Sequence, residues 1–162
     1  MIRIIKATTD NDIQKIADLA NIIWHEHFPP IIGDAQVDYM VEKFQSYPAI
    51  SNAVKNEGYI YYMAYYEDNF CGYIAIHPEE EKVFLSKIYI EKSYRGKKIS
   101  KAMLNQIIAD YPNAKALWLT VNRFNENSIA AYKKMGFEVI REQAADIGNG
   151  FVMDDYVMEK ML

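Results

Sequence analysis

A short basic turn between a predicted strand and a predicted helix could bind a phosphate. It reads Arg95-Gly96-Lys97-Lys98-Ile99-Ser100. The first turn of a helix has unpaired backbone N–H groups and the positive end of the helix dipole, so it stabilises a phosphate. The basic side chains add cationic donors, and Gly96 permits a backbone geometry that other residues resist. Taken alone, such a turn is more typical of a solvated helix start, and it matches neither the P-loop nor the GxGxxG pattern.

A second segment, residues 125–137, carries an amide and a phenol that could act at the same end of a sheet. Asn125 stands at the start of a predicted helix, and Tyr132 follows two turns later. Two structural alternatives exist, because Asn125 would also serve as a plain helix N-cap and Tyr132 as a core aromatic of an amphipathic helix. Together, the two segments indicate a phosphate-bearing cofactor with chemistry at its far end.

The first third of the chain is expected to be largely helical. Residues 2–4 predict a strand, and Thr9 with Asp12 three residues later forms a capping pattern that begins a helix. Helical spacing then relates a stripe of apolar residues, namely Ile13, Ile16, Ala17, Ala20, Ile23 and Trp24. Pro29-Pro30 and Gly33 end this helix. Two shorter helices are predicted, one by Val37, Met40, Val41 and Phe44 and one after Tyr47-Pro48.

The rest of the chain alternates strands with two connecting helices. Two tyrosine-rich runs separated by Glu67-Asp68-Asn69 predict a hairpin. The predicted strands are residues 59–66, 70–76, 82–91, 116–121, 137–141 and 151–161, and the predicted helices are residues 99–110 and 126–135. This order indicates one mixed α/β domain over residues 1–162. Its mostly antiparallel sheet would have about seven strands, flanked by about four to five helices.

The composition argues against several classes of protein. Hydrophobic residues make up 51% of the 162, enough for a sizeable core, and a net charge of −4 disfavours a general nucleic-acid binder. Cys71 is the only cysteine and cannot form an internal disulfide, which fits a reducing cytoplasm. No signal peptide and no apolar run of about 20 residues is found. We therefore expect a cytoplasmic protein with neither a nucleic-acid nor a membrane partner.

The two segments resemble the signatures of the GCN5-related N-acetyltransferase (GNAT) superfamily. The first signature, Arg/Gln-x-x-Gly-x-Gly/Ala after a strand, is similar to residues 95–100. The second is Asn-x-x-Ala/Ser-Ile-x-x-Tyr-x-Lys-x-Gly-Phe. It is matched by Asn125, Ser128, Ile129, Tyr132, Lys134, Gly136 and Phe137. This second match is dense and specific, and the order of elements fits the family over nearly the full chain.

The resemblance implies acetyl-CoA as the cofactor, CoA as a product and direct attack by an amine in a ternary complex. The residues whose backbone N–H groups would bind the pyrophosphate are Arg95, Gly96, Lys97, Lys98, Ile99 and Ser100. Ile88, Tyr89 and Ile90 would pair with the pantetheine arm, and the Ile88 N–H would polarise the thioester carbonyl. Asn125 would bind the arm, Tyr132 would protonate the leaving thiolate, and Lys134 would lie near the phosphates.

The basic turn departs from the family signature at two positions. Lys98 stands where the signature has glycine, and Ser100 stands where it has glycine or alanine. The side chain of Lys98 would either crowd the pyrophosphate or point outward and add charge. We expect cofactor binding to survive with an altered affinity.

The sequence identifies the acceptor-binding residues less directly than the cofactor-binding residues. Histone-type members place a carboxylate four residues before the oxyanion amide, where this sequence has Phe84. The family uses the first two helices and the last strands for acceptors, where the candidate substrate-binding residues are Trp24, Glu26, Asp154 and Asp155. Aromatics beside carboxylates suit a small cationic amine, a polyamine in the first instance. Each carboxylate fits a solvated surface charge equally well. No metal site is expected, since His25 and His27 would project about 200° apart on a helix.

Two other functions remain open at this point. One is a non-catalytic module that senses CoA or a metabolite, and the other is a peptide or protein N-acetyltransferase. The last two strands would also offer an exposed sheet edge that could support a homodimer.

Overall fold

The computed structural model describes all 162 residues, Met1–Leu162. Its strands are β1 (Ile2–Lys6), β2 (Ile60–Tyr66), β3 (Asn69–Pro78), β4 (Lys82–Ile90), β5 (Ala116–Asn122), β6 (Glu138–Gly148) and β7 (Phe151–Met161). Its helices are α1 (Asp10–His27), α2 (Pro29–Ile32), α3 (Asp34–Met40), the π-helix η1 (Val41–Gln45), α4 (Tyr47–Asn56), the 3-10 helix η2 (Lys92–Tyr94), α5 (Ile99–Asp110) and α6 (Glu126–Lys134). None of these helices is both long enough and apolar enough to span a membrane.

The seven strands form one sheet in the order β1-β2-β3-β4-β5-β7-β6. The pairs β1/β2, β2/β3, β5/β7 and β6/β7 are antiparallel, and β4 pairs with β5 in parallel. The predicted mixed, mostly antiparallel fold is therefore confirmed. By its internal contacts the chain divides into two compact units, residues 1–77 with 87–112 and residues 78–86 with 113–162, here called the first and the second unit. The single domain over residues 1–162 stays a prediction.

Local sequence signals place α1 and the hairpin of the first unit. Thr9 and Asp12 form the predicted capping box at the start of α1, whose apolar stripe is buried. The β2–β3 turn consists of Glu67 and Asp68, with φ angles of 48° and 68°. Two successive residues with positive φ are typical of the tight turns that match the twist of a hairpin. Both predictions are thus confirmed.

The two faces of β2 carry different helices of the first unit. The Tyr62 hydroxyl donates to Asp110 of α5 at 2.7 Å. The neighbouring Tyr61 hydroxyl accepts from Lys87 at 2.7 Å, and the Lys87 amine also donates to the Phe44 carbonyl of η1. Because successive strand residues point to opposite faces, α5 covers one face of β2 and η1 covers the other.

The helix predicted from Val37 to Phe44 is divided in two. The α-helix α3 ends at Met40, and η1 continues as one turn of π-helix to Gln45. Gln45 is buried with 2% of its surface exposed and accepts a 2.9 Å hydrogen bond from the Tyr73 hydroxyl. The π-helical turn η1 thus ends in a buried polar side chain that is hydrogen-bonded to β3 of the sheet.

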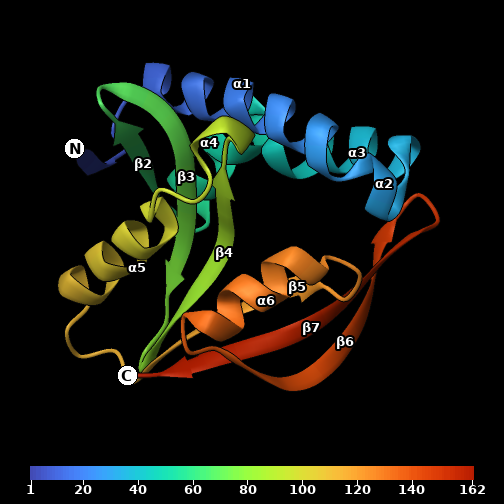
Figure 1. Ribbon diagram of the computed structural model, residues 1–162. Helices are drawn as coiled ribbons and strands as arrows, with labels where there is room; N and C mark the ends of the chain where they lie inside the picture. The colour runs from blue at the N-terminus through green and yellow to red at the C-terminus, as the bar shows by residue number, and fades with distance from the viewer. The chain divides into compact units, whose positions relative to one another are not determined.

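The second unit holds α6 and the long hairpin of β6 and β7. The Lys160 amine donates to the Met135 carbonyl at the end of α6 at 2.8 Å, so α6 covers the face of β7 that carries Lys160 (Figure 1). The alternate residues of β7, including Asp155 and Val157, lie on the opposite face. β6 runs from Glu138 to Gly148, well past the predicted end at residue 141, since its pairing with β7 rather than its own pattern defines it.

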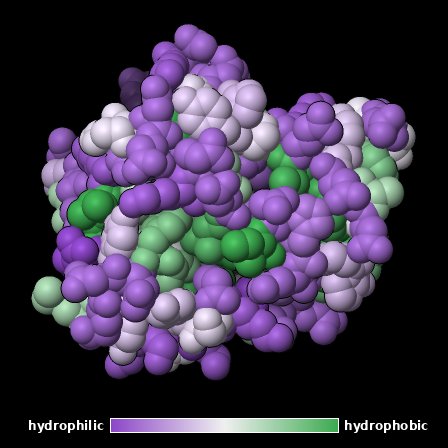
Figure 2. Space-filling model, turned by 90° about the horizontal axis from the view of Figure 1, so that it is seen from above, coloured by the Kyte–Doolittle hydropathy of each residue, from purple (hydrophilic) through white to green (hydrophobic).

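Cys71 lies inside the first unit. It has no exposed surface, and its thiol contacts the Ala64 carbonyl oxygen at 3.5 Å. Burial raises the pKa of the Cys71 thiol. The face of the molecule seen in Figure 2 is by contrast mostly hydrophilic, with hydrophobic residues exposed in limited patches.

Candidate active site

The basic turn belongs to the first unit and leads directly into α5. Gly96 has a φ of 81°, which confirms the need for a glycine-like geometry in this turn. The Arg95 guanidinium donates to the Ile90 carbonyl at 3.3 Å, and the Lys97 amine lies 5.1 Å from the centre of the Tyr66 ring. No side chain caps the start of α5. The first-turn N–H groups of this 12-residue helix therefore fit an anion such as a pyrophosphate.

Lys98 takes up the conformation for which the family signature has glycine. Its φ of 65° and ψ of 23° lie in the left-handed region, and its side chain is exposed. A residue with a Cβ is strained there by about 1–2 kcal/mol, whereas glycine is not. Lys98 thus holds a left-handed backbone conformation that favours glycine, at a cost in stability.

We expect the Lys98→Gly variant to be more stable than the wild type. Relief of the left-handed strain, less the extra backbone entropy of glycine, leaves a gain of up to about 1 kcal/mol. Thermal unfolding should then shift upward by about 2–4 °C for a chain of this size. Lys98→Ala is the matched control, because it removes the charge and keeps the strained Cβ. A lower melting temperature for the glycine variant than for the alanine variant would contradict this account.

The end of β4 lies tight against β3 in the first unit. A Cβ added to Gly72 of β3 would lie 2.7 Å from the Tyr89 carbonyl oxygen. Beyond the strand, the Glu91 N–H donates to the Cys71 carbonyl at 2.7 Å. Ile88 and Tyr89 are half-buried and Ile90 is buried. Glycine at position 72 is therefore what allows β3 to approach the stretch that the resemblance assigns to the pantetheine arm.

Lys87 is a feature of β4 that the sequence analysis missed. Its amine lies between the Phe44 carbonyl and the Tyr61 hydroxyl, and no carboxylate contacts it. Burial lowers the pKa of Lys87 from 10.5 to about 7. The available signal was a lysine within an otherwise apolar stretch of a predicted central strand.

The start of α6 belongs to the second unit. Asn125 is buried with 6% of its surface exposed, and its N–H donates to the Asn122 carbonyl at 3.0 Å. Its side chain makes no capping hydrogen bond to α6, so the structure does not support the alternative in which Asn125 serves only as a helix N-cap. Lys134 is exposed near the end of the same helix.

The ring of Tyr132 packs edge-on against Phe137, with 5.9 Å between the ring centres. Burial raises the pKa of Tyr132 to about 12. At neutral pH the phenol therefore keeps its proton, as a hydrogen-bond donor or an acid must.

The first-unit candidates for the acceptor differ in exposure. Trp24 has 4% of its surface exposed, stacks on Phe28 with ring centres 4.2 Å apart, and has no partner for its indole N–H. Glu26 is exposed. His25 is bonded to Asp38 at 2.7 Å, and this hydrogen bond raises the pKa of the imidazole. No group of three or more potential ligand side chains is arranged to hold a metal.

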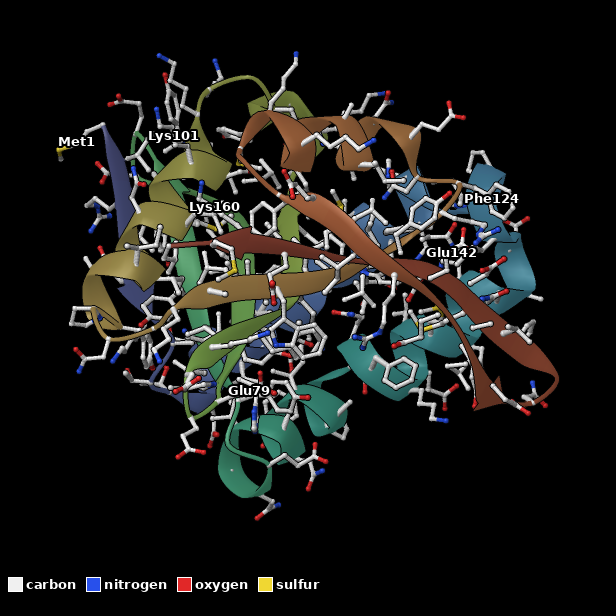
Figure 3. The ribbon with its side chains drawn as sticks, turned by 90° about the horizontal axis from the view of Figure 1, so that it is seen from below. Met1, Glu79, Lys101, Phe124, Glu142 and Lys160 are labelled. Atoms are coloured by element: carbon white, nitrogen blue, oxygen red, sulfur yellow. The ribbon has the colours of Figure 1, made fainter.

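The second-unit candidates are two adjacent carboxylates with different surroundings. The Arg123 guanidinium forms ion pairs with Asp154 at 3.0 Å and with Glu142 at 2.9 Å, and it lies 5.3 Å from the centre of the Tyr156 ring. Figure 3 shows Phe124 and Glu142 at the same end of this unit, with Lys160 towards the other. Asp155 is buried with 3% of its surface exposed, and one carboxylate oxygen has no partner.

Phe84 of β4 stands where histone-type members have a carboxylate. In the second unit it stacks on Trp118 of β5, with ring centres 4.2 Å apart. The Trp118 indole donates to Glu79 at 2.6 Å. This position therefore has an aromatic packing role in the structure.

Comparison with protein families decides the class of the chain. The model of the acetyltransferase (GNAT) family matches residues 16–137. The chain belongs to the GNAT family. The match spans both signature segments and confirms the resemblance and the assignment as an N-acetyltransferase.

Relatives of this GNAT protein are distant in sequence. An uncharacterized N-acetyltransferase of Mycobacterium tuberculosis is 24% identical over 154 residues, covering 93% of this chain and 98% of the relative. A probable spermine N(1)-acetyltransferase of Bacillus subtilis subsp. natto is 29% identical over 85 residues, or 46% of this chain and 56% of the relative.

Solved structures share the fold of this GNAT protein. The PaiA N-acetyltransferase of Thermoplasma acidophilum, solved in complex with coenzyme A, superposes with a TM-score of 0.79 at 21% identity, over 100% of this chain and 99% of that one. The ribosomal-protein-S18-alanine N-acetyltransferase of Escherichia coli has a TM-score of 0.69 at 17% identity, over 99% and 94%. At such identities these neighbours establish the fold and not the acceptor.

Proposed function

We propose that this GNAT protein transfers the acetyl group of acetyl-CoA to a small primary amine by direct attack in a ternary complex. The observation that carries the proposal is the uncapped start of α5 behind a basic turn, in a chain that belongs to an acetyltransferase family. Acetyl-CoA supplies the reactive thioester. The backbone N–H groups of residues 95–100, in the basic turn and at the start of α5, bind its pyrophosphate.

The remaining roles follow from residues of the two signatures. The backbone N–H of Ile88 stabilises the oxyanion that forms when the amine attacks. Asn125 binds the pantetheine arm, and the Tyr132 phenol gives a proton to the departing thiolate. The raised pKa of Tyr132 supports this last role, because the phenol is protonated at neutral pH. No covalent enzyme intermediate is required.

A polyamine is the first acceptor to consider. The relative from Bacillus subtilis subsp. natto is named a spermine acetyltransferase, although it aligns with only 46% of this chain. Carboxylates of this chain at the predicted acceptor positions include exposed Glu26 and buried Asp155. An ammonium group is the natural partner for such groups.

The test is an acetylation assay with a panel of amines and peptides, read out as free CoA thiol. We expect thiol release with spermidine and spermine, and binding of CoA by isothermal titration calorimetry. Turnover with peptides alone would replace the polyamine proposal by a peptide acceptor. CoA binding without turnover of any acceptor would favour a sensing module, and no binding of CoA or acetyl-CoA at millimolar concentration would remove the cofactor proposal.

Assembly and location are further predictions. β6 lies at the edge of the sheet and exposes Val139 and Ile140, which supports a homodimer formed through this edge. A cytoplasmic location is the expectation drawn from the single cysteine.

A further inference from the structure

Asp155 of β7 is a buried carboxylate with an unfilled hydrogen-bonding position. Only 3% of its surface is exposed, and its Oδ1 atom has no partner. Buried polar atoms in folded proteins nearly always have a partner, and a buried charge without one is costly. A buried carboxylate oxygen without a hydrogen-bond partner therefore indicates a cationic or proton-donating ligand that supplies the missing interaction.

The residues that pair directly with Asp155 supply no counter-charge to its carboxylate. Two basic residues share this face of β7, because Arg141 of β6 pairs with Val157 and Lys82 of β4 forms an ion pair with Glu159. The residues paired with Asp155 are Asn122 on β5 and Gln143 on β6, and both are uncharged. The guanidinium of Arg123 pairs instead with Asp154, whose side chain belongs to the opposite face. Burial, together with the charge of Asp154, raises the pKa of Asp155 to about 6.

Asp155 also lies beside the segment that leads to the cofactor-binding helix. The carbonyl of Asn122 accepts the N–H of Asn125 at 3.0 Å, and Asn125 begins α6, which carries Tyr132. Side chains of directly paired residues on neighbouring strands have Cβ atoms about 5 Å apart. Within the second unit, the orphaned carboxylate is thus one strand away from the start of this helix.

We propose that Asp155 binds the ammonium group of the acceptor and takes a proton from it. The assignment rests on the proposed acetyl transfer. The carboxylate accepts one proton from the ammonium group, and the freed lone pair attacks the thioester carbonyl carbon. The C–N bond forms and the C–S bond breaks. Tyr132 protonates the thiolate and recovers a proton from the acylated nitrogen, while Asp155 releases its own to water.

The experiment compares wild type with Asp155→Asn, using Glu159→Gln as the matched control on the same strand and face. For spermidine we expect kcat/KM of Asp155→Asn to fall about 100-fold, in the range of general-base catalysis. The wild-type rate should fall on acidification through a pKa of about 6, and this decline should be absent from the asparagine variant and present in the control. Spermidine should also bind at least about tenfold more weakly to the variant in the presence of CoA.

Two further measurements separate a role in the reaction from a role in folding. CoA affinity should be unchanged in Asp155→Asn, and its melting temperature should not fall, since a buried unpaired charge has been removed. Equal spermidine affinity of wild type and Asp155→Asn, or an unchanged pH profile, would overturn the assignment. Absence of turnover by the wild type would instead overturn the proposed function, while the binding comparison would still decide whether Asp155 holds an amine.

Discussion

Raising the pH from about 7 to about 9.5 should stabilise the folded protein by about 2–4 kcal/mol through Lys87. Burial lowers the pKa of this lysine from 10.5 to about 7. Between these two values the unfolded chain holds a proton that the folded chain lacks, so unfolding takes up a proton. The contribution of Lys87 to stability therefore rises with pH across this window, and this gain is lost as the pH falls back towards 7.

The surroundings of Lys87 explain why the neutral amine is accommodated. It can donate to the Phe44 carbonyl and accept from the Tyr61 hydroxyl without a charge. Burial raises the pKa of Tyr61, so its hydroxyl keeps its proton throughout the window. The charge of Glu57 favours the ammonium form, but its effect on the pKa of Lys87 is outweighed by burial.

Denaturant unfolding followed by tryptophan fluorescence at both pH values measures this effect. The control is Lys87→Met, which keeps a flexible side chain of similar length and removes the titrating group. Its stability should change much less with pH over the window, and it should exceed that of the wild type at pH 7. Parallel pH profiles for the two proteins would contradict the assignment.

Tyr132→Phe should lower kcat for acetyl transfer by about 100-fold, the effect expected for loss of a general acid. The ring still packs against Phe137, so the fold and the affinity for CoA should be retained. Steady-state kinetics with the best acceptor and calorimetric titration of CoA measure the two quantities. Tyr65→Phe, a hydroxyl deletion on β2, is the control. An unchanged kcat in Tyr132→Phe would mean that another group protonates the thiolate.

Much of the fold could be predicted because its signals are local. The Thr9 and Asp12 capping box, the Glu67-Asp68 turn and the limits of α5 are each specified by residues a few positions apart. The π-helix Val41–Gln45 could not be predicted this way. Its Gln45 and Phe44 are bonded to Tyr73 and Lys87, which lie 28 and 43 residues along the chain.

The residues of the candidate site show the same contrast between features specified by nearby residues and features that depend on residues far apart in the sequence. Tyr132 and Asn125 stand out in the sequence because a dense signature surrounds them. Asp154 and Asp155 look alike in the sequence, and only the pairing of β7 with its neighbours distinguishes them. One bonds to Arg123 and the other is buried with an orphaned oxygen. The environment of the Lys87 amine likewise could not be predicted, because it is formed by Tyr61 and Phe44, which are distant in the sequence.

The buried thiol of Cys71 gives the protein an internal reporter of its own unfolding. The thiolate is the form that reacts with disulfide reagents, and both burial and a raised pKa suppress it in the folded chain. In an assay for CoA release, the enzyme itself should add little background. Any slow labelling of Cys71 would then count the molecules that open or unfold, so the same reagent measures turnover and conformational stability in one sample.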